Sequence, residues 1–203
     1  MSYPSFFDEV PPLRMRDPLA AFLGATEGGL IEYRYIDAVR LAGHSCPTVA
    51  SAYRLTGLAL AALYGGEVPE RGGVHVSFRD SRTAGVTGVI ANVVSLLTGA
   101  TVDTGFKGLA GRFDRRDLLA FDAELPLDLR FRRVDSGVAV DVMSTLREVP
   151  ANPRMMPLMH LCLAGQASTD EVQEFRRLWQ DRVRRVLLEH GDDPGVFVVR
   201  PVN

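Results

Sequence analysis

The stretch LAGHSCPTVASAYRLTGLALAALYGG, residues 41–66, decides the fold. Its apolar and small residues predict one buried helix over 47–64, because Pro47 suits the first turn of a helix and the two glycines after residue 64 end it. Small side chains allow such a helix to pack closely against its neighbours. His44 and Cys46 stand in the short link directly before this helix. The link therefore holds reactive side chains at the start of a central element.

The sequence on either side of this helix predicts a mixture of helices and strands. Alternating runs on both sides of the turn DSG, residues 135–137, predict a β-hairpin. Ser168 or Thr169 can cap a long amphipathic C-terminal helix, whose first turn is acidic. The fold class is therefore α+β, a mixed sheet packed by helices. Further helices are expected over 30–42, 89–97 and 154–165, and further strands over 72–80, 109–116 and 195–202.

The composition of the chain argues against some classes of function. The 203 residues are 46% hydrophobic and 24% charged, and their formal net charge of −2 argues against a nucleic-acid partner. We divide the chain into an N-terminal arm over 1–29, which holds several aromatic residues, and one domain over 30–203. No apolar run is long enough for a membrane span and no leader pattern is visible, so a cytoplasmic location is expected. Two cysteines in that compartment are thiols or ligands rather than a disulfide.

Two His-x-Cys pairs are the candidate metal ligands. Zinc favours imidazole and thiolate donors, and a link before a helix N-terminus favours a thiolate, which makes His44 and Cys46 the first choice. The alternative is a capping or core histidine beside a buried thiol. His160 and Cys162 are secondary candidates on a methionine-rich helix, where residues two apart point about 200° apart. That second pair is better explained as core.

Two further residues are candidate contacts to a substrate or an anion. His75 lies in the predicted strand and should share one face with Ser77, a face that is either solvent-exposed or part of a site. Lys107, the single lysine of the chain, lies in the glycine-rich stretch TGATVDTGFKG, which lacks the spacing of a phosphate-binding P-loop. A solvated lysine is the alternative there.

The order of the motifs resembles the FmdE family, which takes its name from a component of formylmethanofuran dehydrogenase. The resemblance covers residues 35–190 and rests on GHSCP, LTGAT and GFKGLAGRF. It implies an α+β metal-binding domain, commonly with zinc, that often forms dimers, and it does not imply the dehydrogenase reaction. His44, Cys46 and Lys107 match family motif positions. Ala100 stands where the family often has cysteine, and Asn92 where a carboxylate is typical, so a bound metal here needs water or another ligand.

The sequence leads to one hypothesis of function and two alternatives. The first is an FmdE-like protein that binds zinc through His44 and Cys46, forms a homodimer and takes a small-molecule ligand, with an unknown reaction. The second is a haem- or corrinoid-binding sensor or enzyme, since histidine, Cys-Pro and small-residue helices suit a tetrapyrrole pocket. The third is a non-catalytic accessory protein of a larger complex. Whether the protein is an enzyme stays open at this point.

Overall fold

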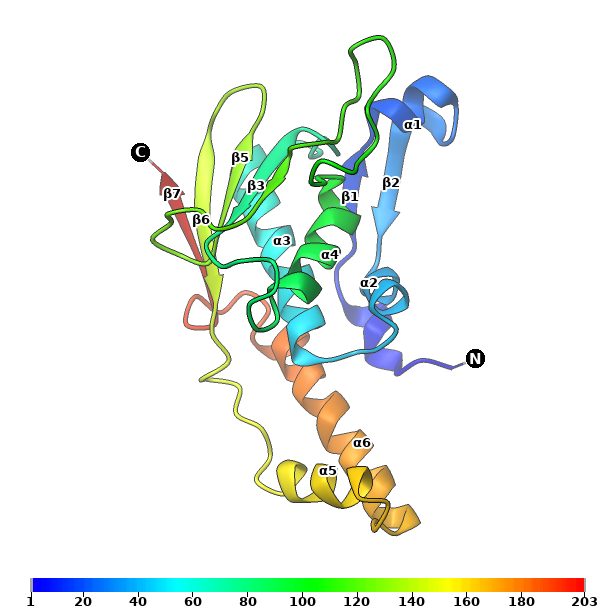
Figure 1. The fold of residues 1–203 in the computed structure, drawn as a ribbon. Coiled ribbons are helices and arrows are strands. Elements are labelled where there is room, and N and C mark those ends of the chain that lie inside the picture. Colours follow the sequence, from blue (N-terminus) through cyan, green and yellow to red (C-terminus); the bar gives the residue numbers. More distant parts are fainter. Residues whose placement is uncertain (1, 203) are drawn as a thin grey trace.

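The computed structural model describes residues 2–202, and its elements form three layers (Figure 1). Helices α3 (Pro47–Tyr64) and α4 (Thr87–Thr98) form the middle layer. A mixed sheet covers one side of them, and a small two-stranded sheet covers the other. The mixed sheet has the order β4-β3-β5-β6-β7, in which β3 and β4 are parallel and the other pairs are antiparallel. Its strands are β3 (Val74–Phe78), β4 (Leu119–Ala120), β5 (Leu129–Arg133), β6 (Ala139–Ser144) and β7 (Phe197–Val202).

Helix α3 has the predicted bounds and is almost entirely buried. Pro47 occupies its first turn, and Gly65 ends it in the left-handed conformation at φ 57°. The hydroxyl of Tyr53 lies 3.0 Å from the carbonyl oxygens of Tyr33, in the small sheet, and of Pro11, just before that sheet, and its single proton is shared between them. A Cβ on Gly57 would lie 2.8 Å from Leu13 Cδ2, so the missing side chain permits the close approach of that sheet. The small residues of the helix thus serve packing.

Strand β3 shows the predicted alternation of faces. Val74, Val76 and Phe78 are buried, whereas His75 and Ser77 face the other side and are half-buried. The predicted hairpin is confirmed as β5 and β6, and both strands pair in antiparallel register. The mixed α+β fold with a sheet and a long C-terminal helix is therefore confirmed.

The prediction of a helix over the whole of 30–42 is wrong at its start. Residues Leu30–Tyr33 form strand β2, which pairs antiparallel with β1 (Leu13–Arg16), and helix α2 covers only Tyr35–Ala42. Pairing with a partner strand outweighs the helical spacing there. The N-terminal region also contains the 3-10 helices η1 (Ser5–Glu9) and η2 (Glu27–Gly29) and the helix α1 (Pro18–Leu23). Phe6 and Phe7 are buried, so this arm packs on the body.

The predicted strand over 109–116 is also wrong. These residues belong to a long loop, in which Ala110 and Phe113 have positive φ angles of 48° and 65° that a strand does not allow. The loop is held by Arg115, whose buried guanidinium donates to Asp17 Oδ1 at 2.8 Å. Arg71 donates to the other oxygen of Asp17 at 3.0 Å. The loop is therefore held by a buried ion pair to Asp17 and not by pairing with another strand.

The C-terminal helices extend away from the body (Figure 1). Helix α5 (Met155–Leu163) packs against α6 (Thr169–Arg184), and α6 continues as the π-helical turn η3 (Arg185–Glu189). Of the two predicted caps, Ser168 is the one that caps α6, in a capping box with Glu171. Met155, Leu158 and Leu178 form a separate small core there. Within residues 2–202, no helix combines the length and the apolar character needed to cross a bilayer.

Candidate functional site

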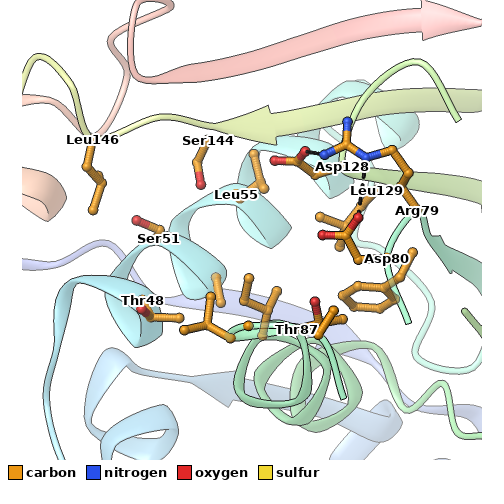
Figure 2. A pocket seen from close by; sticks show the side chains of 16 residues that line it. Thr48, Ser51, Leu55, Arg79, Asp80, Thr87, Asp128, Leu129, Ser144 and Leu146 are labelled. Carbon is orange, nitrogen blue, oxygen red and sulfur yellow. Dashed lines mark hydrogen bonds and ion pairs between the residues drawn. The ribbon is translucent and has the colours of Figure 1, made fainter. Parts of the chain in front are cut away.

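A cavity of about 440 Å³ lies between the mixed sheet and the helix layer (Figure 2). The first turns of α3 form one wall, and the start of α4 with the loop before it forms another. The C-terminal ends of β3 and β6 and the residues just before β5 complete the lining. The size suits a small organic molecule. We refer to this cavity as the inner pocket.

Hydroxyl groups line one end of the inner pocket. Thr48 and Ser51 come from α3, and Ser144 comes from the end of β6 (Figure 2). Ser51 is only 6% exposed, and its Oγ has no hydrogen-bond partner among residues 2–202. A buried hydroxyl without a partner costs about 1–3 kcal/mol. This end of the pocket therefore holds a polar group that the fold itself does not satisfy.

Three charged residues form the opposite end of the pocket (Figure 2). Arg79 Nη2 donates to Asp128 Oδ1 at 2.7 Å, and Arg79 Nε lies 3.5 Å from Asp80 Oδ1. Burial raises the pKa of Asp128 above its usual value, the Arg79 guanidinium opposes this rise, and the nearby Asp80 carboxylate adds to it. Two carboxylates share a single guanidinium, which leaves one negative charge at this end.

Apolar side chains separate the two polar ends. Leu55 lies between them in Figure 2, and Phe78, Ile90 and Leu129 also line the cavity. Thr87 begins α4 at the wall of the pocket, and no side chain caps this helix. The pocket thus offers separate polar contacts joined by an apolar surface, the pattern of a small-molecule site.

A second, wider hollow of about 610 Å³ lies between the N-terminal arm, the end of α2 and helix α6. Its lining is rich in aromatic side chains and includes His44; we refer to it as the aromatic groove. The aromatic residues are Tyr3, Phe7, Phe175 and Trp179. Trp179 Nε1 donates to the carbonyl of Ser45 at 2.9 Å, which fixes α6 against the link that carries His44.

The structure separates the two residues of the His-x-Cys motif. His44 is exposed, and its Nδ1 lies 2.9 Å from the carbonyl of Ala42, so Nδ1 carries the proton and Nε2 keeps its lone pair. Cys46 is buried, and its Sγ accepts a hydrogen bond of 3.5 Å from the backbone N–H of Val49 at the start of α3. His44 thus faces the groove, whereas Cys46 acts as a helix cap within the core.

The other candidate residues from the sequence lie apart from both cavities. His160 is exposed and Cys162 is half-buried on α5, and Lys107 is exposed in the long loop. His75 lies on the sheet face away from α3, where burial, and then the positive charge of Arg132, lowers its pKa. Within residues 2–202, no group of three or more His, Cys, Asp or Glu side chains is placed to hold a metal ion. Zinc at His44 and Cys46 stays a prediction.

The residues of the inner pocket were missed by the sequence analysis. Ser51 looked like one more small residue of a tightly packed helix, and Asp128 looked like part of a hairpin strand. One available signal was the pair Arg79–Asp80 directly after a buried strand, since ligand sites often gather where strands end. No local sequence pattern predicts that Ser51 and Ser144 line the same cavity.

The fold and the inner pocket define an α+β protein with a partly open, small-molecule-sized cavity beside its central helix. Comparison with protein-family models finds no match, and comparison with curated proteins finds no similar sequence.

Proposed function

We propose that this protein binds a small organic molecule in the inner pocket. The observation that carries the proposal is the buried hydroxyl of Ser51, which lines the cavity and has no partner within the protein. A fold keeps such a group at a cost, because burying a polar group without a hydrogen bond is unfavourable. A ligand that bonds to Ser51 regains this cost on binding. The enclosing apolar side chains supply the remaining contacts.

A fragment screen observed by two-dimensional NMR tests this proposal. We expect fragments to shift the amide signals of α3 near Ser51 and of the start of α4. The variant Ser51→Leu fills the pocket and should abolish these shifts. Ala62→Leu is the matched control, because Ala62 is exposed on the same helix. Circular dichroism checks that both variants are folded. Fragments that shift only signals outside the pocket, or that bind equally to Ser51→Leu, would contradict the proposal.

A metal or metallocofactor held by His44 is the second candidate function. The favouring observation is that the Ala42 carbonyl holds Nδ1 of His44, which leaves Nε2 free as a ligand at the aromatic groove. Zinc there would need water or exogenous ligands to complete its shell. A haem or other tetrapyrrole fits the aromatic lining better, because its flat face would pack against Phe175 and Trp179. Such a group would supply redox or gas-binding chemistry.

Metal analysis and haem titration test this second candidate. We expect His44→Ala to lower the bound zinc or haem per chain, whereas His160→Ala, at an exposed histidine of α5, and Cys162→Ser should not. Equal occupancy in folded His44→Ala protein would exclude His44 as a ligand. The FmdE-like identity belongs with this candidate, and it is supported by the order of elements: the His-x-Cys-Pro link, α3, β3, α4 and the lysine loop.

A homodimer remains a proposal as well. The extended pair of α5 and α6 leaves Leu163 79% exposed and Met156 46% exposed, which is more apolar surface than a monomer needs to present. Light scattering at micromolar concentration should give twice the chain mass of 22.2 kDa. A monomer mass under those conditions would reject the dimer.

A further inference from the structure

The charges of the inner pocket indicate what kind of ligand it takes, provided that the pocket is a ligand site as proposed above. Arg79, Asp80 and Asp128 are the charged side chains among the described residues that line it. One guanidinium against two carboxylates leaves an excess of one negative charge. A ligand with a positively charged group would neutralise this excess, whereas an anionic group would be repelled.

The geometry favours an organic cation over a metal ion at this end. Arg79 already contacts one oxygen of Asp128 at 2.7 Å and lies 3.5 Å from an oxygen of Asp80. A divalent metal needs several oxygen ligands arranged around it and would have to displace this guanidinium. An ammonium group needs only one free acceptor on each carboxylate, because its three N–H donors can turn independently. Asp80 faces Arg79 through Oδ1 and its side chain is 57% exposed, so its other oxygen can accept such a contact.

The hydroxyls at the other end of the pocket favour a ligand with an oxygen that can form hydrogen bonds. The buried Oγ of Ser51 has no partner, and the hydroxyls of Ser144 and Thr48 lie at the same end (Figure 2). A hydroxyl can donate to a ligand oxygen and can also accept from a ligand hydroxyl. Leu55 lies between the two ends, so the middle of the ligand should be a short apolar segment.

We propose that the ligand of the inner pocket is a small organic amine whose ammonium group lies against Asp80 and Asp128 and whose oxygen function lies against Ser51 and Ser144. Amino alcohols and amino acid derivatives without a net negative charge belong to this class. The inference rests on two independent observations, the excess charge at one end and the unpartnered buried hydroxyl at the other.

An NMR titration with a matched probe series tests the inference. The probes are ω-amino alcohols with two to six methylene groups, the corresponding 1-alkanols, the N-acetylated amino alcohols and the ω-hydroxy acids. We expect the best amine to bind in the pocket at least tenfold more tightly than its alkanol and its N-acetylated form. The hydroxy acid should bind most weakly.

Variants locate the effect on the two carboxylates. Asp128→Asn and Asp80→Asn should each weaken amine binding at least fivefold and leave alkanol binding unchanged. Asp135→Asn is the matched control, because Asp135 is an exposed, arginine-paired carboxylate on the β5–β6 turn, away from the pocket. If Asp128→Asn fails to fold, Asp80→Asn decides the question, since the side chain of Asp80 is 57% exposed and its removal should not disturb folding.

The outcomes separate this inference from the proposed function. Binding of alkanols or hydroxy acids in the pocket as tightly as amines would overturn the inference and leave the small-molecule site intact. Amine binding that is equal in Asp80→Asn and in Asp135→Asn would overturn it as well. If neither the fragments nor any probe shifts signals of the pocket, both proposals fall. Selective amine binding that both carboxylate variants weaken would support both.

Discussion

The inner pocket and the aromatic groove differ in almost every physical respect, although residues close in sequence line them. His44 and Ser45 border the groove, and Thr48 borders the pocket only a few residues later. The groove lies where α2, α6 and the N-terminal arm meet, and aromatic rings dominate its wall. The pocket lies between the sheet and the helices and has hydroxyls at one end and charges at the other (Figure 2).

The start of helix α3 causes this separation. Cys46 is its N-cap and is buried in the core, where its sulfur accepts a hydrogen bond from the N–H of Val49. His44, two residues before this cap, is exposed at the groove, whereas Thr48 and Ser51 in the first turns of the helix line the pocket. A sequence motif whose members stand two residues apart is therefore no guarantee of a shared site.

The largest effect is expected from removing the side chain that forms the wall of the groove. Trp179→Ala should lower the free energy of unfolding by about 3 kcal/mol, because a large aromatic contact is lost. The hydrogen bond from Trp179 to the Ser45 carbonyl is lost with it. Urea unfolding measures this change. Val138→Ala, at a side chain that is 53% exposed, is the control and should change stability by less than about 0.5 kcal/mol. Ligand binding in the inner pocket should persist in folded Trp179→Ala; its loss would show that the two cavities are coupled.

Single substitutions of the two residues in the His-x-Cys motif should differ in their effect on stability. Cys46→Ala should cost about 1–2 kcal/mol of stability, since it removes a helix cap and a buried sulfur. His44→Ala, at an exposed side chain, should change stability by less than about 0.5 kcal/mol.

Metal or haem content then distinguishes two accounts of the same pair. The zinc hypothesis from the sequence needs both side chains as ligands. The geometric account needs only His44, because His44 is exposed at the aromatic groove whereas Cys46 is buried as a helix cap. Full occupancy in folded Cys46→Ala and loss in His44→Ala would support the geometric account. Loss of bound metal or haem in both variants would indicate that Cys46 is also a ligand.

Removing the unpartnered hydroxyl of Ser51 should stabilise the ligand-free protein and weaken its binding of a ligand in the inner pocket. Ser51→Ala should raise the free energy of unfolding of the ligand-free protein by about 1 kcal/mol, because a buried group without a partner is removed. The same change should weaken amino alcohol binding. Thermal unfolding with and without the ligand measures both effects. A loss of stability on Ser51→Ala would show that the hydroxyl is already satisfied in the free protein.

The smallest effect concerns His75 on the outer face of the sheet. Its pKa is lowered mainly by burial, so the unfolded chain binds a proton at a higher pH than the folded protein does. This contribution to stability is present above pH 6.5 and is lost as the pH falls toward the lowered pKa. Unfolding free energies across this range should depend less steeply on pH in His75→Gln than in the parent.

Local patterns were sufficient for much of the fold. Pro47, the small residues after it and Gly65 predict the bounds of α3 because helix start, packing and end each have a local cause. The capping box of Ser168 and the hairpin of β5 and β6 were predictable for the same reason. Strand β2 was not, because its apolar spacing also suits a helix and only pairing with β1 decides between them.

The sequence by itself determined the α+β class, the central helix and the rarity of its histidines and cysteines. Only the tertiary structure decided that His44 is exposed at the aromatic groove, whereas Cys46 is buried as a helix cap. It also brought together Ser51, Asp128 and Ser144 around one cavity, from a helix, a loop and a strand end. Helix caps and turns arise from contacts within a few residues, so a sequence displays them. A pocket arises where layers meet, and the partners that it brings together leave no shared pattern along the chain.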